Sequence, residues 1–286
     1  MYESMKDMLH RAHEGGYAVM AINAINLETA RGIIAAAEEL RAPIIIDLLQ
    51  DQLKAYFDGD LLIAPLRRMA EASHVPVAVN LDHGHDIAHL KRCLHEGFSS
   101  VMCDASALPV EENIRITQAV VELAQIYGAS VEAEVGCMGC SQGAGAHFTD
   151  AAMYTDPHVA IDFIQRTGID CLAVSYGSTH GDYPPGYVPT FQFEIVEQIK
   201  EATGLPLVLH GGSGAGKENI QASVRAGINK INVGTDYMVT QRDHAARTLA
   251  ANPACDWPQL LQDCWAAGSE KIKTYIELSG SAGKAH

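Results

Sequence analysis

Eight short apolar segments recur along the chain, and each is followed by a stretch with the pattern of a helix. This alternation predicts a parallel sheet covered by helices. Eight such units in 286 residues fit a single (β/α)8 TIM barrel better than an open doubly wound sheet. No G-x-G-x-x-G follows the first segment, which disfavours a dinucleotide-binding fold. The expected strands cover 17–22, 42–46, 75–81, 100–103, 131–135, 171–175, 205–209 and 231–234.

No linker or shift in composition divides the chain, so residues 1–286 are predicted to form one domain. A polar, glycine-containing segment at about 137–156 interrupts the fifth unit and is predicted to be a mobile active-site loop. Residues 258–286 are expected to form a C-terminal helix and a flexible tail. The other expected helices are 27–40, 60–73, 85–96, 110–127, 157–167, 190–203 and 217–226.

The net charge of −15 argues against nucleic acid or an anionic membrane as the main partner. An acidic chain that binds phosphate must do so locally, with backbone N–H groups or a metal. No apolar run reaches the ~18 residues of a membrane span, and the seven cysteines suit reduced thiols, so we expect a cytoplasmic protein. Cys137 and Cys140 form a CxxC without a second pair, which disfavours a structural zinc or redox role.

Polar residues stand at the ends of the expected strands, which in a barrel of this kind open on one face. Histidines at the ends of the third, sixth and seventh strands are each followed by glycine, and three such ligands suit a zinc site with an open position. The 13 histidines would place a few at strand ends by chance, but the repeated His-Gly pair favours a metal. The strand-end residues are Asn23, Asp82, His83, Asp104, Ser106, Glu132, Glu134, His180, Gly181, His210, Asn232, Thr235 and Asp236.

The stretch LPLVLHGGSGAG at 205–216 joins a buried strand to the helix expected from 217. Its glycines allow backbone N–H groups to approach an anion, and the helix directs its positive end toward the same place. Taken alone, a purely structural turn explains these glycines equally well.

The carboxylates leave two interpretations open. Asp82 adjoins a histidine of the trio and could move a proton, or it could cap the following helix. Glu132 and Glu134 share one face of a strand, where two inward acids require a cation or hydrogen-bond donors. Lys230 could be proposed as a Schiff-base lysine, but it precedes the end of the eighth strand and the histidines make it unnecessary.

Seven motifs together resemble the class II, zinc-dependent sugar-phosphate aldolases, a family that includes fructose- and tagatose-1,6-bisphosphate aldolases. They are AINAINLET at 21–29, LDHG at 81–84, SVMCDAS at 100–106, EAEVG at 132–136, HGDY at 180–183, LHGGSG at 209–214 and INVGTD at 231–236. The resemblance covers nearly the whole chain. It implies a lyase that reversibly cleaves a ketose phosphate to dihydroxyacetone phosphate and an aldehyde through a zinc-stabilised enediolate.

The same resemblance assigns roles to individual positions. It makes Asp82 the catalytic acid/base, and it implies a homodimer or homotetramer with one catalytic Zn²⁺ in each subunit. A monovalent cation, Na⁺ or K⁺, would sit on backbone carbonyls near Thr179, Gly181 and Gly211. The implied zinc ligands are His83, His180 and His210, with Glu134 and Asp104 either near an alternate metal position or among the residues that surround and support it. The implied substrate- and phosphate-binding residues are Asn23, Gly181, Gly211, Ser213, Asn232, Gly234 and Thr235.

The chain departs from the family pattern in the half of the site that takes the aldehyde. Segment 137–142 lacks the loop carboxylate found in one branch, and Asp47 and Asp51, expected after the second strand, would repel a second phosphate. We therefore expect dihydroxyacetone phosphate as donor and an aldehyde other than glyceraldehyde 3-phosphate. The alternatives are a bisphosphate aldolase proper, a non-catalytic sugar-phosphate-binding subunit and a zinc hydrolase. Loss of a ligand histidine or of Asp82 would mark the second, and the third needs no phosphate-binding turn.

Overall fold

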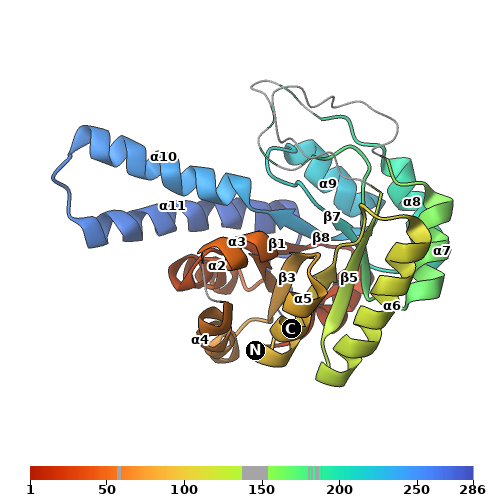
Figure 1. Ribbon diagram of the computed structural model, residues 1–286. Coiled ribbons are helices and arrows are strands. Elements are labelled where there is room, and N and C mark those ends of the chain that lie inside the picture. The colour runs from red at the N-terminus through yellow and green to blue at the C-terminus, as the bar shows by residue number, and fades with distance from the viewer. Residues whose placement is uncertain are drawn as a thin grey trace.

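Eight parallel strands close into a barrel in the order of the chain, which confirms the predicted (β/α)8 fold (Figure 1). The computed structural model describes residues 1–56, 59–136, 154–179, 181, 183, 187 and 189–285. The strands are β1 (Val19–Asn23), β2 (Ile44–Leu49), β3 (Val77–Gly84), β4 (Ser100–Cys103), β5 (Ser130–Val135), β6 (Cys171–Val174), β7 (Leu207–Leu209) and β8 (Ile228–Val233).

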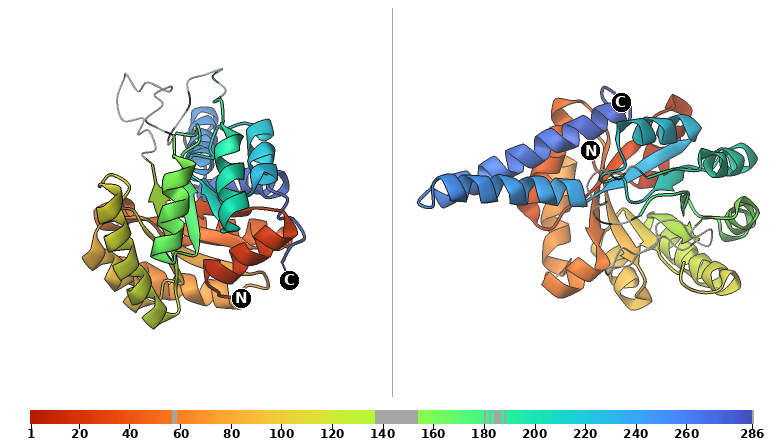
Figure 2. Two further views of the ribbon diagram at one scale, coloured as in Figure 1. Left: turned by 90° about the vertical axis from the view of Figure 1, so that its right-hand side faces the viewer. Right: turned by 90° about the horizontal axis from the view of Figure 1, so that it is seen from above.

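Helices surround this barrel, as the view from above shows (Figure 2). Within the described residues, none of them is long and apolar enough to cross a bilayer. The helices are α1 (Met5–Gly15), α2 (Leu27–Glu39), α3 (Gln50–Tyr56), α4 (Gly59–Ala72), α5 (Ile87–Glu96), α6 (Val110–Tyr127), α7 (Pro157–Thr167), α8 (Phe193–Thr203), α9 (Lys217–Ala226), α10 (Thr235–Ala251) and α11 (Trp257–Leu278).

Helix α1, which the sequence analysis did not predict, covers the amino end of the barrel. The backbone N–H of Met5 donates to the Ser100 and Ser130 hydroxyls at 3.0 and 3.1 Å. Its apolar face packs on the inward residues of the lower barrel, including Val19, Ile45 and Val208. The lower barrel is therefore filled with side chains, and the opposite, carboxyl end is left to carry the site.

Five strands extend beyond their predicted limits, and three of them do so by three residues. Strand β2 runs to Leu49, β3 runs to Gly84, and β8 begins at Ile228. Asp47 therefore lies inside β2, paired in register with Asn80 of β3, and the expectation that it follows the strand is wrong. Apolar runs locate the centre of a strand better than its ends, where polar residues such as Asp47 and Asp82 continue the pairing.

The two last helices form a hairpin that projects from the barrel, as Figure 1 and the view from above in Figure 2 show. In α10 only Tyr237 is buried. The tail after α11 is packed, contrary to the flexible tail expected: Ser281 is buried, and the N–H groups of Gly283 and Ala285 donate to carbonyls of residues 40 and 41. Residues 137–153, which make up most of the expected mobile loop and include its CxxC, lie outside the described residues.

Candidate active site

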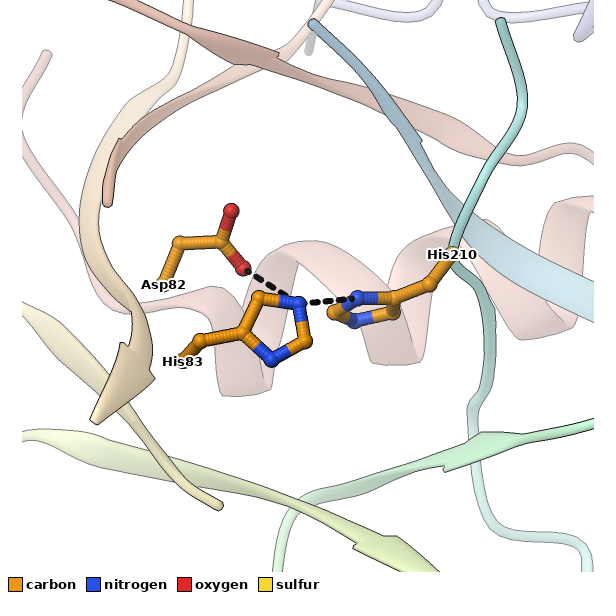
Figure 3. A group of neighbouring side chains, drawn as sticks. All are labelled: Asp82, His83 and His210. Atoms are coloured by element: carbon orange, nitrogen blue, oxygen red, sulfur yellow. Dashed lines mark hydrogen bonds and ion pairs between the residues drawn. The ribbon is translucent and has the colours of Figure 1, made fainter. Parts of the chain in front are cut away.

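His83 and His210 face each other at the carboxyl end of the barrel (Figure 3). Nε2 of His83 lies 3.1 Å from Nδ1 of His210, and the rings meet edge to face at 4.8 Å between centroids. Asp82 Oδ1 lies 3.9 Å from the same Nε2. One donor atom from each of the three lies within 4.8 Å of the others, which is the spacing of ligands around a single ion.

A carboxylate stands behind each of the two imidazoles. Asp104 Oδ2 lies 2.8 Å from Nδ1 of His83, and Glu132 Oε1 lies 2.7 Å from Nε2 of His210. An ionised carboxylate only accepts hydrogen bonds, so these outer ring nitrogens carry hydrogens. Against the effect of burial, the surrounding carboxylates, Asp82 first, raise the pKa of His83 to about 10, so without a metal its Nε2 also carries a hydrogen, which Nδ1 of His210 accepts. A bound metal would take the place of that hydrogen between the two inner nitrogens. Carboxylate–histidine pairs of this kind orient the ligands of protein-bound metals, so the residues present fit a metal.

The local backbone explains how two consecutive residues, Asp82 and His83, both face the interior of the barrel. Successive side chains of a regular strand alternate between faces. His83 has φ of 50°, and the β3–β4 register shifts between Leu81 and Gly84, so a bulge redirects the histidine. At Gly84 a Cβ would lie 2.5 Å from the Met102 carbonyl oxygen, so only glycine fits there. Strain of this kind is typical of functional sites.

Asp82 is buried and held by two amides. Asn23 Nδ2 donates to its Oδ2 at 2.8 Å, and Asn232 Nδ2 donates to its Oδ1 at 3.4 Å. The alternative role as a helix cap is wrong, since Asp86 caps α5 and accepts from the N–H groups of residues 88 and 89. Burial opposes ionisation of Asp82, but the electrostatic influence of His83 and of the neighbouring cations outweighs it and lowers the carboxyl pKa. Asp82 is therefore an ionised base beside the histidine pair.

The two carboxylates of the predicted metal region occupy different places. Asp104 follows β4 and is held by the Ser106 hydroxyl at 2.7 Å. Burial opposes ionisation of Asp104, but its hydrogen bond with His83 and the charge of that ring outweigh burial and lower its pKa. Glu134, in β5, is buried and forms a second group of candidate ligands with His83 and Asp104. His180, the third predicted ligand, lies outside the described residues.

The glycine turn after β7 lies against the turn after β6. Gly211 has φ of 71°, and a Cβ there would overlap the Thr179 carbonyl, so the two backbones meet at the place predicted for a monovalent cation. Gly181, the third residue of that prediction, also has a positive φ, of 95°. Two adjacent turns with left-handed glycines therefore border the histidine pair.

The predicted phosphate-binding residues lie at strand ends and in the turns that follow them: Asn23 ends β1, Asn232 lies in β8, Gly181 follows β6, Gly211 and Ser213 follow β7, and Gly234 and Thr235 lie at the start of α10. The Gly212 N–H donates to the Asn232 carbonyl at 3.0 Å, which joins the turn after β7 to β8. The Ser213 hydroxyl accepts from the Asp236 N–H at 3.1 Å, in the first turn of α10, which begins at Thr235. At Gly234 a Cβ would lie 2.5 Å from Asn23 Oδ1, so glycine is required beside the amide that holds Asp82. The turn after β7 therefore lies against the amino terminus of α10, and a helix amino terminus of this kind favours an anion.

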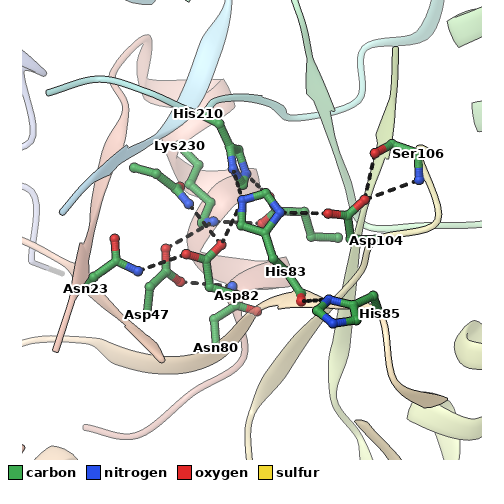
Figure 4. Close-up of polar contacts among 12 residues, drawn as sticks. Asn23, Asp47, Asn80, Asp82, His83, His85, Asp104, Ser106, His210 and Lys230 are labelled. Carbon is green, nitrogen blue, oxygen red and sulfur yellow. Dashed lines mark hydrogen bonds and ion pairs between the residues drawn. The ribbon is translucent and has the colours of Figure 1, made fainter. Parts of the chain in front are cut away.

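A group of buried charges below the histidines was not predicted as part of the site (Figure 4). Lys230 Nζ lies 2.7 Å from Glu132 Oε2 and 3.6 Å from Asp47 Oδ2, and Asn80 Nδ2 donates to Asp47 Oδ1 at 2.9 Å. Glu132, which the strand pattern expected to need a cation or donors, has both. Lys230 is fully buried and ion-paired, and the two carboxylates raise its pKa against the effect of burial, so it is not a Schiff-base nucleophile. In a strand, residues two apart point to the same face. Counting back two residues from Asp82 gives Asn80 and from Asn232 gives Lys230, and this spacing could have predicted that both face the interior.

Comparison with known proteins agrees with this architecture. The family model for "Fructose-bisphosphate aldolase class-II" matches residues 3–284. A probable fructose-bisphosphate aldolase of Bacillus subtilis is 40% identical over 252 residues, covering 87% of each chain. The D-tagatose-1,6-bisphosphate aldolase subunit GatY of Klebsiella oxytoca is 36% identical over 283 residues, covering 98% of each chain.

A solved structure extends this agreement to three dimensions. The crystal structure of the YdjI aldolase from Escherichia coli K12 superposes with a TM-score of 0.87 at 32% identity, and the match covers 100% of both chains. These three relatives are named as aldolases, in agreement with the lyase that the sequence predicts. The family model spans nearly the whole chain, and relatives of 36–40% identity cover most of it. The chain belongs to the class-II fructose-bisphosphate aldolase family.

Proposed function

We propose that this chain is a zinc-dependent aldolase that reversibly cleaves a ketose phosphate to dihydroxyacetone phosphate and an aldehyde. The observation that carries the proposal is the pair of inward imidazoles, each backed by a carboxylate, beside the ionised Asp82. Relatives named as fructose- and tagatose-bisphosphate aldolases support a sugar phosphate as the substrate.

The metal would be held by Nε2 of His83, Nδ1 of His210 and the side chain of His180. Neutral imidazole nitrogens with an open position suit zinc. These residues would hold a divalent cation, which would supply positive charge to polarise the ketose carbonyl and stabilise the negative charge that develops on its oxygen. Glu134 and Asp104 lie within reach of the same ring of His83 and supply the carboxylates of the predicted alternate position.

The phosphate of the substrate would bind at the paired turns. Gly181, Gly211 and Ser213 would offer backbone N–H groups and a hydroxyl from the turns after β6 and β7, and Gly234 and Thr235 from the positive end of α10. This local arrangement allows a chain of net charge −15 to hold an anion. We include the monovalent cation near Thr179, since carbonyl oxygens suit Na⁺ or K⁺.

Asp82 would move the proton of the hydroxyl that becomes the aldehyde oxygen. In the cleavage direction its carboxylate accepts that proton as the carbon–carbon bond breaks, and in the reverse direction it returns the proton. Asn23 and Asn232 donate to its two oxygens and so fix the carboxylate plane. Asn23 therefore contributes to the substrate site by orienting Asp82.

The acceptor side supports an aldehyde without a second phosphate. Strand β2 ends at the apolar Leu49, and the exposed Asp51 follows it. The nearby cation Lys54 is paired with Asp86 at 2.7 Å. Asp47 does not face the acceptor side, because it is buried against Lys230 below the site.

We also propose a homodimer or homotetramer in the cytoplasm. The described cysteines all carry free thiols, four of them buried, as is usual for a reducing compartment. The projecting α10–α11 hairpin supports association with another copy.

The proposal is tested by following the release of dihydroxyacetone phosphate from a ketose 1-phosphate and from fructose 1,6-bisphosphate. We expect cleavage that EDTA abolishes and zinc restores, with kcat/KM for the monophosphate at least equal to that for the bisphosphate. A large preference for the bisphosphate would contradict the acceptor assignment alone. Cleavage of neither, in a zinc-bound protein, would favour the non-catalytic binding subunit.

A further inference from the structure

Lys230 is the one described cation with a side chain wholly inside the barrel, and it touches strands that are not its neighbours (Figure 4). It projects from β8, which pairs with β1 and β7. Its ammonium reaches Glu132 on β5 at 2.7 Å and Asp47 on β2 at 3.6 Å. Lysine is almost never fully buried without such partners, so the ion pair explains how the chain tolerates it.

The two carboxylates are not equivalent partners. Burial raises the pKa of Asp47 to about 7, against the opposing effect of Lys230. Lys230 Nζ lies 2.7 Å from Glu132 Oε2 and 3.6 Å from Asp47 Oδ2, so the shorter contact identifies Lys230–Glu132 as the tighter ion pair.

Glu132 uses its other oxygen to hold His210. Oε1 lies 2.7 Å from Nε2 of the imidazole, while Nδ1 is turned toward His83. An ionised Glu132 can only accept, which requires the hydrogen on Nε2. If Glu132 were neutral or displaced, the hydrogen could move to Nδ1 and block the nitrogen that faces the metal position.

Comparison with His83 shows why the carboxylate behind His210 needs a lysine. Asp104 plays the corresponding part for His83, but its side chain is 20% exposed and a serine hydroxyl also supports it. Glu132 is 0% exposed, so water cannot stabilise its charge. An internal cation has to do so instead.

We propose that Lys230 is a positioning residue of the metal site, which acts through Glu132 to fix His210 with its hydrogen on Nε2 and Nδ1 directed inward. The inference rests on the proposed function only in taking His210 as a metal ligand. The proposal connects three residues, Lys230 on β8, Glu132 on β5 and His210 after β7. A substitution of Lys230 is therefore expected to alter the metal site although Lys230 does not contact the metal.

The test compares Asp47→Asn with the double variant Asp47→Asn/Lys230→Met. The single variant removes the weaker carboxylate and leaves Lys230–Glu132 intact, so it is the matched control. Relative to it, we expect the double variant to bind zinc about 10–100-fold more weakly in a chelator competition. In ¹⁵N spectra of the metal-free protein, we expect His210 to show the Nε2–H tautomer in the control and a mixture in the double variant. Equal zinc affinity and an unchanged tautomer would overturn the proposal.

Should the double variant not fold, Glu132→Gln replaces it. Glutamine has the same size and can either accept from Nε2–H or donate to a bare Nε2, so we expect mixed His210 tautomers and weaker zinc binding. A role in packing alone predicts no change for this isosteric variant. Failure of the proposed function is distinguishable, because it would appear as absent aldol cleavage by the wild-type enzyme while the tautomer and zinc results still hold.

Discussion

At the scale of single residues, Asp82 carries the chemistry and its surroundings keep it ready for that role. Its pKa is lowered because the cationic neighbours, His83 first, outweigh burial, so it is ionised at neutral pH. Two amide donors fix its plane. A base that is both ionised and oriented needs no rearrangement before it accepts a proton.

Replacement of Asp82 by asparagine should remove the proton acceptor and preserve the shape of the site. We expect kcat for ketose-phosphate cleavage to fall by about 10²–10⁴-fold, the usual contribution of a general base. Zinc content, measured on the same sample by atomic absorption, should stay unchanged. Activity within threefold of wild type, with zinc bound, would show that another group moves the proton.

The pKa of Asp47 is shifted in the opposite direction to that of Asp82, because burial raises it from 3.8 to about 7. Between these values the folded state binds more protons than the unfolded state, so rising pH destabilises the fold. Asp47→Asn should abolish this loss. In urea unfolding the variant should gain on wild type from pH 5 to pH 8, with a ceiling of about 4 kcal/mol over the full shift. An equal difference in free energy at both pH values would contradict the assignment.

At the scale of elements, the turn between β7 and α9 depends on one glycine more than on its neighbours. Gly211 combines φ of 71° with a backbone carbonyl in the place of a Cβ, whereas Gly216 has φ of 86° and open space. Gly216→Ala should cost about 1–3 kcal/mol of unfolding free energy from its backbone alone, because φ of 86° with ψ of 152° is a conformation that few residues other than glycine adopt. Gly211→Ala should cost at least about 1 kcal/mol more, since the overlap is added to the strain, and should weaken zinc binding by displacing His210. An equal loss of unfolding free energy in the two variants, measured by denaturant unfolding, would contradict the close approach of Gly211 to the Thr179 carbonyl.

The sequence predicted elements well where apolar patterning was regular. The helices 110–127, 157–167 and 217–226 and the strand 100–103 have the predicted bounds. It failed where tertiary contacts decide: α1 is stabilised by hydroxyls of β4 and β5 that are distant in sequence. Strand-end motifs identified Asp82, His83 and His210, whereas Asp47, Asn80 and Lys230 were missed as a group because their pairing requires the closed barrel.

At the scale of the whole molecule, the α10–α11 hairpin leaves apolar side chains uncovered at its tip. Trp257, at the start of α11, is 61% exposed, and Leu249, near the end of α10, is 40% exposed. Residues of this kind anchor protein interfaces. An arm that extends from the barrel can reach a second copy of the chain.

Light scattering should therefore give the mass of two or four copies of the 30.7 kDa chain. We expect the double variant Leu249→Ser/Trp257→Ser to dissociate at higher concentration than wild type, since it removes apolar area from the interface. The exposed Glu122→Ser on α6 serves as the control away from the arm. A wild-type monomer at all concentrations would exclude the interface.

The most direct test of the account is the exchange of dihydroxyacetone phosphate protons in deuterated water, followed by NMR with the zinc-loaded enzyme. It examines the histidine pair and the phosphate-binding turns without knowledge of the aldehyde. We expect a carbon-bound proton next to the ketone to exchange, EDTA to stop the exchange, and added zinc to restore it. Absence of exchange by a folded, zinc-bound protein would contradict the proposed aldolase activity and leave family membership as a statement of ancestry.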